Sequence, residues 1–135
     1  MIEKMIAQIK KYLPLKIAEI VWDGTIFQMY GTNWNFTTLS AWRISTKDYI
    51  EIGCFDKNSI DLVNELKELT ISEISLQDER LKIDPVFHLS NGQKIEIFST
   101  DTYEPWTFKV NDLDLFVATP SSPQSFNRSS NQKIE

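Results

Sequence analysis

The sequence predicts an α+β fold: a mostly antiparallel sheet of about eight or nine strands with two amphipathic helices. Three observations support this class. The chain has 135 residues, of which 41% are hydrophobic, as expected for one globular domain. Two segments carry apolar residues at helical spacing. Most of the remaining chain alternates apolar and polar residues between turn signals such as Asp23-Gly24 and Asn91-Gly92.

The first predicted helix covers residues 2–13 and stops at Pro14, which cannot continue a helix. Its apolar residues share one face: Ile2, Met5, Ile6, Ile9 and Leu13. The second helix is predicted from Asn58 to Leu69, with Asn58 or Ser59 capping its free N–H groups. Ile60, Val63 and Leu66 line one side of this helix. Each apolar face must dock on the sheet.

Nine runs have the composition and alternation of strands: 16–21, 25–30, 34–44, 49–55, 70–76, 81–89, 94–99, 106–110 and 113–118. In the run 34–44, alternation places Trp34, Phe36 and Trp42 on one face and Arg43 on the other. Aromatic residues on one face of a sheet are most often core, here under the N-terminal helix. An aromatic platform for a ligand or a partner protein is the alternative.

The turn at Asn91-Gly92 favours a three-residue loop, Ser90 to Gly92, with glycine in the left-handed position. A two-residue loop would place apolar residues on both faces, whereas three residues pair Phe87 with Ile95 and keep one apolar face. His88 then lies on the opposite face, near Lys94 and Glu96. Pro85 suggests an edge strand or a bulge.

We expect one domain over residues 1–118, followed by a polar tail over 119–135 that is rich in serine and proline. A faint internal repeat is also visible. "LKIAEI" at Leu15 resembles "LTISEI" at Leu69, and "WNF" at Trp34 resembles "WTF" at Trp106. The repeat either arises by chance or indicates a pseudo-twofold arrangement of two helix-plus-sheet halves.

The net charge of −5 is distributed unevenly. The segment 96–116 holds five acids against one lysine: Glu96, Asp101, Glu104, Asp112 and Asp114 against Lys109. Nucleic-acid binding needs a basic surface, so we expect no nucleic-acid partner, whereas an acidic face attracts a basic protein. No apolar run approaches the length that crosses a membrane, so we expect no membrane association and a cytoplasmic location.

The chain lacks the residue sets of common catalytic sites. The sole histidine is His88 and the sole cysteine is Cys54, which lies on the apolar side of its strand, so that a Cys54–His88 dyad is a weak hypothesis. Neither spacing for a metal site nor a glycine-rich phosphate loop is present, and we expect no cofactor and no metal. Asp112 and Asp114 fit solvated turn residues.

"TLSAWRIS" from Thr38, "IGCFD" from Ile52, "LSNGQKIEIF" from Leu89 and the later Trp106 form an ordered set of short motifs. In order and spacing they resemble a group of small uncharacterised bacterial proteins with a central W-R-I strand. The resemblance covers about residues 20 to 110. It implies an α+β domain with a shared core, and it implies no activity.

Three functional hypotheses follow. The first is a non-catalytic protein-binding domain, such as an acidic immunity protein that covers a toxin, with Asp101, Asp112 and Asp114 as candidate contacts. The second is a small-ligand site or enzyme with a pocket around four residues: Arg43, Trp34, Trp42 and Glu104. Arg43 would either pair internally with Glu51 or Glu104 or point into that site. The third is a homodimer formed through the N-terminal helix or an exposed strand.

Overall fold

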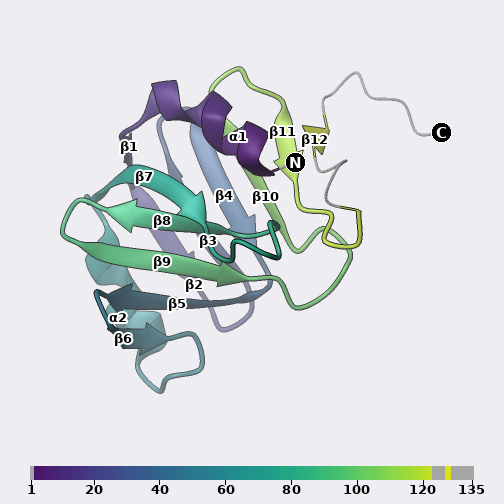
Figure 1. The fold of residues 1–135 in the computed structure, drawn as a ribbon. Coiled ribbons are helices and arrows are strands. Elements are labelled where there is room, and N and C mark those ends of the chain that lie inside the picture. The colour runs from purple at the N-terminus through teal and green to yellow at the C-terminus, as the bar shows by residue number, and fades with distance from the viewer. Residues whose placement is uncertain (1, 123–126, 129–135) are drawn as a thin grey trace.

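A computed structural model describes residues 2–122 and 127–128. It contains two antiparallel sheets, and the α+β class is confirmed. Sheet A has the order β1-β7-β8-β9-β5-β6, and sheet B has the order β12-β11-β10-β4-β3-β2. The single sheet of about eight or nine strands is therefore wrong. Figure 1 shows the strands of the two sheets crossing steeply, as in an orthogonal sandwich.

The strands of sheet A are β1 (Leu15–Lys16), β5 (Ala41–Thr46), β6 (Tyr49–Gly53), β7 (Thr70–Leu76), β8 (Pro85–Leu89) and β9 (Gln93–Phe98). The strands of sheet B are β2 (Glu19–Trp22), β3 (Phe27–Gly31), β4 (Trp34–Thr38), β10 (Trp106–Val110), β11 (Leu115–Val117) and β12 (Asn127–Arg128). Both sheets mix early and late strands, so neither half of the chain forms a unit of its own.

Two runs that were predicted as single strands are each divided between the sheets. The run 16–21 contributes β1 to sheet A and β2 to sheet B, and the run 34–44 contributes β4 to sheet B and β5 to sheet A. The chain changes sheets at Ile17–Ala18 and at Leu39–Ser40. Strands that switch sheets form the corners of orthogonal sandwiches. No glycine or proline marks either position.

The predicted aromatic face is buried between the sheets. Trp34, Phe36 and Trp42 are 4%, 0% and 1% exposed, so the interpretation as core is confirmed. The ring centroids of Phe36 in sheet B and Phe87 in sheet A lie 4.8 Å apart, and those of Phe27 and Trp42 lie 4.8 Å apart as well. These aromatic pairs fix the two sheets against each other.

The helices are shorter than predicted. Helix α1 (Ile2–Ile9) continues as the 3-10 helix η1 (Lys10–Tyr12), and α2 (Ser59–Leu62) continues as η2 (Val63–Leu66). Helix α1 buries Ile2, Met5 and Ile9, as its pattern predicted. In the second helix Ile60 is 51% exposed, so it is not part of the apolar face.

The expected N-cap of the second helix is also wrong, because neither Asn58 nor Ser59 caps it. Asn58 at the N-cap position makes no side-chain hydrogen bond to the helix. The Ser59 hydroxyl instead donates to the Cys54 carbonyl at 3.2 Å and accepts the Trp22 indole N–H at 3.0 Å. These bonds hold α2 against β2.

The hairpin of β8 and β9 has the predicted register, with Phe87 opposite Ile95 and His88 opposite Lys94. Gly92 has φ of +92°, and its N–H donates to the Leu89 carbonyl at 3.0 Å. The suggestion of an edge strand at Pro85 is wrong, since β8 lies between β7 and β9. Pro85 is tolerated because it is the first residue of its strand.

The repeated segments pair with each other within the two sheets. Lys16 lies opposite Thr70 at the edge of sheet A, and Phe36 lies opposite Phe108 at the centre of sheet B. Each sheet draws strands from both halves of the chain, so the two halves are not separate helix-plus-sheet units, and the pseudo-twofold arrangement stays a prediction. Most of the predicted tail lies outside the described residues, although Asn127–Arg128 pairs with β11 as β12.

Candidate functional site

Arg43 lies in β5 on the outward face of sheet A, directly opposite Glu96 of β9. Its guanidinium donates twice to that carboxylate, from Nε at 3.1 Å and from an Nη at 2.9 Å. Ser45 donates a third bond to Glu96, and the Phe98 ring centroid lies 4.8 Å from the guanidinium carbon. Arg43 is thus paired internally, with Glu96 rather than with Glu51 or Glu104.

This pairing determines the charge of both groups. Burial raises the pKa of the Glu96 carboxyl, but hydrogen bonds from Arg43 and Ser45 outweigh burial, so the pKa lies below its ordinary value. The hydrogen bond to Glu96 raises the pKa of Arg43. Both side chains stay charged at neutral pH, and the bidentate geometry makes them a cross-strand clamp.

A hollow of about 360 Å³ opens beside this clamp and is lined by Arg43, Tyr49, Lys94 and their neighbours. Trp34 and Trp42 do not reach it, because both lie in the core between the sheets. Glu104 lies in the loop after β9 and does not line the hollow either. The structure therefore does not bring these four candidate residues together.

The acidic segment is divided between the two ends of β10. Asp101 and Glu104 precede this strand, whereas Asp112 and Asp114 follow it. Since a strand rises about 3.4 Å per residue, the two pairs are roughly 15 Å or more apart. Asp101, Asp112 and Asp114 are exposed. These acids therefore do not form one continuous face.

Cys54 and His88 also lie apart. Cys54 is buried and follows β6, while His88 lies in β8, and β9 and β5 separate these two strands. At about 4.8 Å per strand, the two side chains are too distant for a dyad. His88 instead shares a hydrogen bond with the Ser75 hydroxyl at 2.7 Å through its Nε2. Cys54 acts as a small apolar residue, as its pattern predicted.

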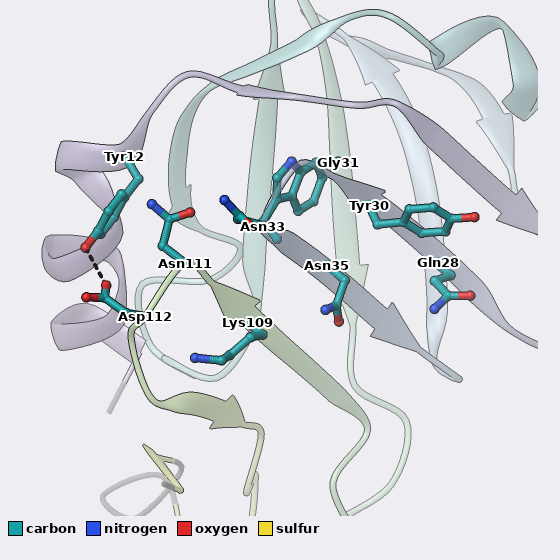
Figure 2. A pocket seen from close by; sticks show the side chains of 10 residues that line it. Tyr12, Gln28, Tyr30, Gly31, Asn33, Asn35, Lys109, Asn111 and Asp112 are labelled. Atoms are coloured by element: carbon teal, nitrogen blue, oxygen red, sulfur yellow. Dashed lines mark hydrogen bonds between the residues drawn. The ribbon is translucent and has the colours of Figure 1, made fainter. Parts of the chain in front are cut away.

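A concavity with a volume of about 1010 Å³ lies on the outward face of sheet B and is called here the sheet B concavity (Figure 2). Tyr12, Gln28, Tyr30, Gly31, Asn33, Trp34, Asn35, Lys109, Asn111 and Asp112 line it. The Tyr12 hydroxyl donates to Asp112 at 3.0 Å and closes one end. That hydrogen bond, together with burial and the negative charge, raises the pKa of Tyr12.

A separate apolar surface, called here the Phe55 patch, consists of Leu39 and Phe55 around a hollow of about 200 Å³. Phe55 is 89% exposed and Leu39 is 62% exposed. Leu39 occupies the outward position at the corner between β4 and β5, where its N–H donates to the Pro105 carbonyl at 3.2 Å. Exposed apolar side chains that adjoin one another, unlike single ones, often mark a contact surface.

Sequence reasoning missed both surfaces. In the run 34–44, alternation puts Leu39 on the same side as Arg43, and Leu39 is exposed there. An apolar residue on this outward side was the signal in the sequence that could have indicated the Phe55 patch. Nothing in the sequence indicated that Asn33 and Asn111 meet, because they are brought together by pairing of β4 with β10.

Comparisons of this chain with protein-family models, with curated proteins and with solved structures gave no match. The resemblance to W-R-I proteins therefore stays a prediction. Within the described residues, no helix has the length and apolar character required to cross a membrane. The same residues contain no group of three or more His, Cys, Asp or Glu side chains positioned to hold a metal ion.

Proposed function

We propose that this chain is a non-catalytic, cytoplasmic protein-binding domain that covers a basic surface of a partner protein, as immunity proteins cover toxins. The observation that carries the proposal is the Phe55 patch and the carboxylates beside it. Phe55 provides an aromatic anchor that is 89% exposed, and aromatic anchors supply most of the binding energy at protein interfaces.

Carboxylates stand next to the patch along three segments. Asp56 follows Phe55, and Asp23 precedes the turn that brings Thr25 to the hollow. Asp101 lies in the loop that contacts the corner, where the Thr100 N–H donates to the Ser40 hydroxyl at 3.4 Å. Lys57 is the single cation among residues 23–26, 39–41, 54–57 and 100–105. The patch therefore has an apolar centre and a negative rim. It is complementary to a partner surface that has an apolar centre and a positive rim.

The charge of Asp23 at this rim is held by the backbone. The Asp23 carboxylate accepts the backbone N–H groups of Ile26 and Thr25 at 2.8 and 2.9 Å, and these bonds lower its pKa. Opposite charges at the rim of an interface accelerate association and select the partner. Helix α1 supplies no rival interface, since its apolar residues Ile2, Met5 and Ile9 are buried in this chain's own core.

The test is co-expression of this chain with the products of its neighbouring genes, followed by size-exclusion chromatography and titration calorimetry. Phe55→Lys places a positive charge in the patch and should weaken the complex by about tenfold or more. Leu81→Lys is the matched control: Leu81 is 64% exposed and lies beside Lys82, which pairs with Glu3 of α1. A complex that Phe55→Lys leaves intact, or neighbours whose products do not bind, would overturn the proposal.

A further inference from the structure

The sheet B concavity has the chemistry of a ligand site, and it lies apart from the Phe55 patch. Its side chains come from η1, from β3, β4 and β10, and from two turns at the same end of sheet B, one between β3 and β4 and the other between β10 and β11. Figure 2 shows Asn33 and Asn111 beside each other, with the Tyr12–Asp112 pair at one end and Tyr30 and Gln28 toward the other. Its volume of about 1010 Å³ is that of a site for an extended ligand.

Strand register builds the floor of the concavity. Tyr30 lies opposite Asn35, and Asn35 lies opposite Lys109, so these three residues form one row across β3, β4 and β10. Neighbouring strands are about 4.8 Å apart, so the row of three polar groups spans roughly 10 Å across the sheet. The Trp34 indole N–H donates to the Lys16 carbonyl at 3.0 Å, so this donor is not available to a ligand.

The two turns are rigidly placed. Asn33 and Asn111 both have positive φ, at 65° and 50°. The Asn111 N–H donates to the Asn33 carbonyl at 2.6 Å and ties the turns together. Asparagine tolerates this left-handed backbone better than other side chains do. Asn33 and Asn111 therefore lie beside each other at the same end of the concavity (Figure 2).

The side chains of four residues offer amide groups here: Gln28, Asn33, Asn35 and Asn111. Within residues 2–122 and 127–128, none of these four amides has a hydrogen-bond partner in the chain, and Asn33, Asn35 and Asn111 are exposed. Each amide both donates and accepts, so its matching partner is a group that does both, which is a hydroxyl. Asp112 also keeps one carboxylate oxygen that the bond from Tyr12 does not use.

The charges and the aromatic surface of the concavity indicate which class of ligand would fit it. Lys109 and Asp112 contribute one charge of each sign, and the Lys109 ammonium already donates to the Leu113 carbonyl, so a neutral ligand fits best. The Tyr30 ring is 38% exposed and provides a flat apolar surface for the C–H face of a sugar. We propose that the sheet B concavity binds a neutral oligosaccharide through its amide side chains and the Tyr30 ring.

The test is titration calorimetry and ¹H–¹⁵N NMR with the full chain and four neutral probes: cellotetraose, maltotetraose, chitotetraose and mannotetraose. At least one probe should bind and shift the backbone signals of β3, β4 and β10. Asn35→Ala and Tyr30→Ala should each weaken that binding by about tenfold, the effect of losing one good contact. Asn64→Ala, in η2, is the control and should leave binding unchanged.

Three outcomes overturn this proposal. The first is that none of the four probes binds at millimolar concentration. The second is binding that Asn35→Ala and Tyr30→Ala do not change, with thermal melts showing that both variants are folded. The third is preference for the anionic tetramer of galacturonic acid over all neutral probes. None of these results bears on the Phe55 patch, so the two proposals stand or fall separately.

Discussion

The carboxylate of Asp84 accepts the indole N–H of Trp106 at 3.0 Å, and this bond joins the two sheets. Asp84 precedes β8 of sheet A and is 3% exposed, whereas Trp106 begins β10 of sheet B. The same carboxylate accepts the backbone N–H and the hydroxyl of Ser99 at 2.7 and 2.5 Å. Three donors therefore satisfy a carboxyl group that water does not reach.

Replacing Asp84 should destabilise the fold strongly. Asp84→Ala removes the buried acceptor of three hydrogen bonds, from Trp106 and Ser99, and should lower the free energy of unfolding by about 2–4 kcal/mol. Asp84→Asn retains one acceptor oxygen and should cost less. Urea denaturation measures both values. Asp101→Ala, at an exposed site, should change stability by about 0.5 kcal/mol or less, and an equal loss in both alanine variants would contradict this assignment.

The Arg43–Glu96 clamp predicts a dependence of stability on pH. Because the pKa of Glu96 is lower in the folded chain, its ionisation stabilises the fold above its ordinary pKa, and this contribution disappears as pH falls through the folded value. Glu96→Gln removes the contribution. At neutral pH we expect a loss of about 1–3 kcal/mol, reduced by the partial exposure of Arg43.

The difference between wild type and Glu96→Gln should shrink as the solution is acidified below the ordinary range of a glutamate. Urea denaturation at a series of pH values measures it. Ser45→Ala removes one of the donors to Glu96 and should reproduce part of the effect with the same sign. A difference that stays constant through the acid range would show that Glu96 acts through packing instead.

Gly31 should not accept a side chain. A Cβ atom at this position would lie 2.2 Å from the Lys16 carbonyl oxygen and 2.4 Å from the Trp34 indole nitrogen. Gly31→Ala should therefore lower the free energy of unfolding by about 2 kcal/mol or more. Gly53→Ala is the matched control, since the nearest atom there lies 3.5 Å away. Comparable losses in the two variants would rule out the close approach as the cause.

The Tyr12–Asp112 bond should be visible in an alkaline titration. Asp112→Asn removes the negative charge and the strong acceptor, so the pKa of Tyr12 should fall toward its ordinary value. NMR titration of the ring signals of Tyr12 measures this change directly. Asp114→Asn changes a nearby charge without touching the hydrogen bond and should shift the pKa less. If both variants give the same shift, the long-range charge and not the bond is responsible.

Local pattern was enough to predict the faces and the hairpin. Alternation placed Trp34, Phe36 and Trp42 in the core, and the need for one apolar face gave the three-residue loop ending at Gly92. These features depend on residues close together in the sequence. A shift of one residue in the strand or in the loop would move a whole set of apolar side chains to the solvent face. The sequence is therefore compatible with one register, and that register can be predicted.

The sheet changes were not predictable in the same way. At Leu39–Ser40 the chain passes from sheet B to sheet A while the alternation continues, since Leu39 is exposed and Ser40 is buried. No residue is inserted or lost at this corner, so the alternation of buried and exposed residues does not reveal where the chain changes sheets. The partner of Arg43 and the sheet B concavity likewise depend on pairings distant in sequence: β5 with β9, and β4 with β10.

The central position of β10 in sheet B has a consequence for synthesis on the ribosome. Strands β2, β3 and β4 end at Thr38, but the strand that covers the other side of β4 begins at Trp106. The edge of β4 that later pairs with β10 therefore stays unpaired while about half of the chain is translated. We therefore expect nascent chains that end before β10 to aggregate rather than fold. A partner protein should then bind only chains in which β10 has already been synthesised.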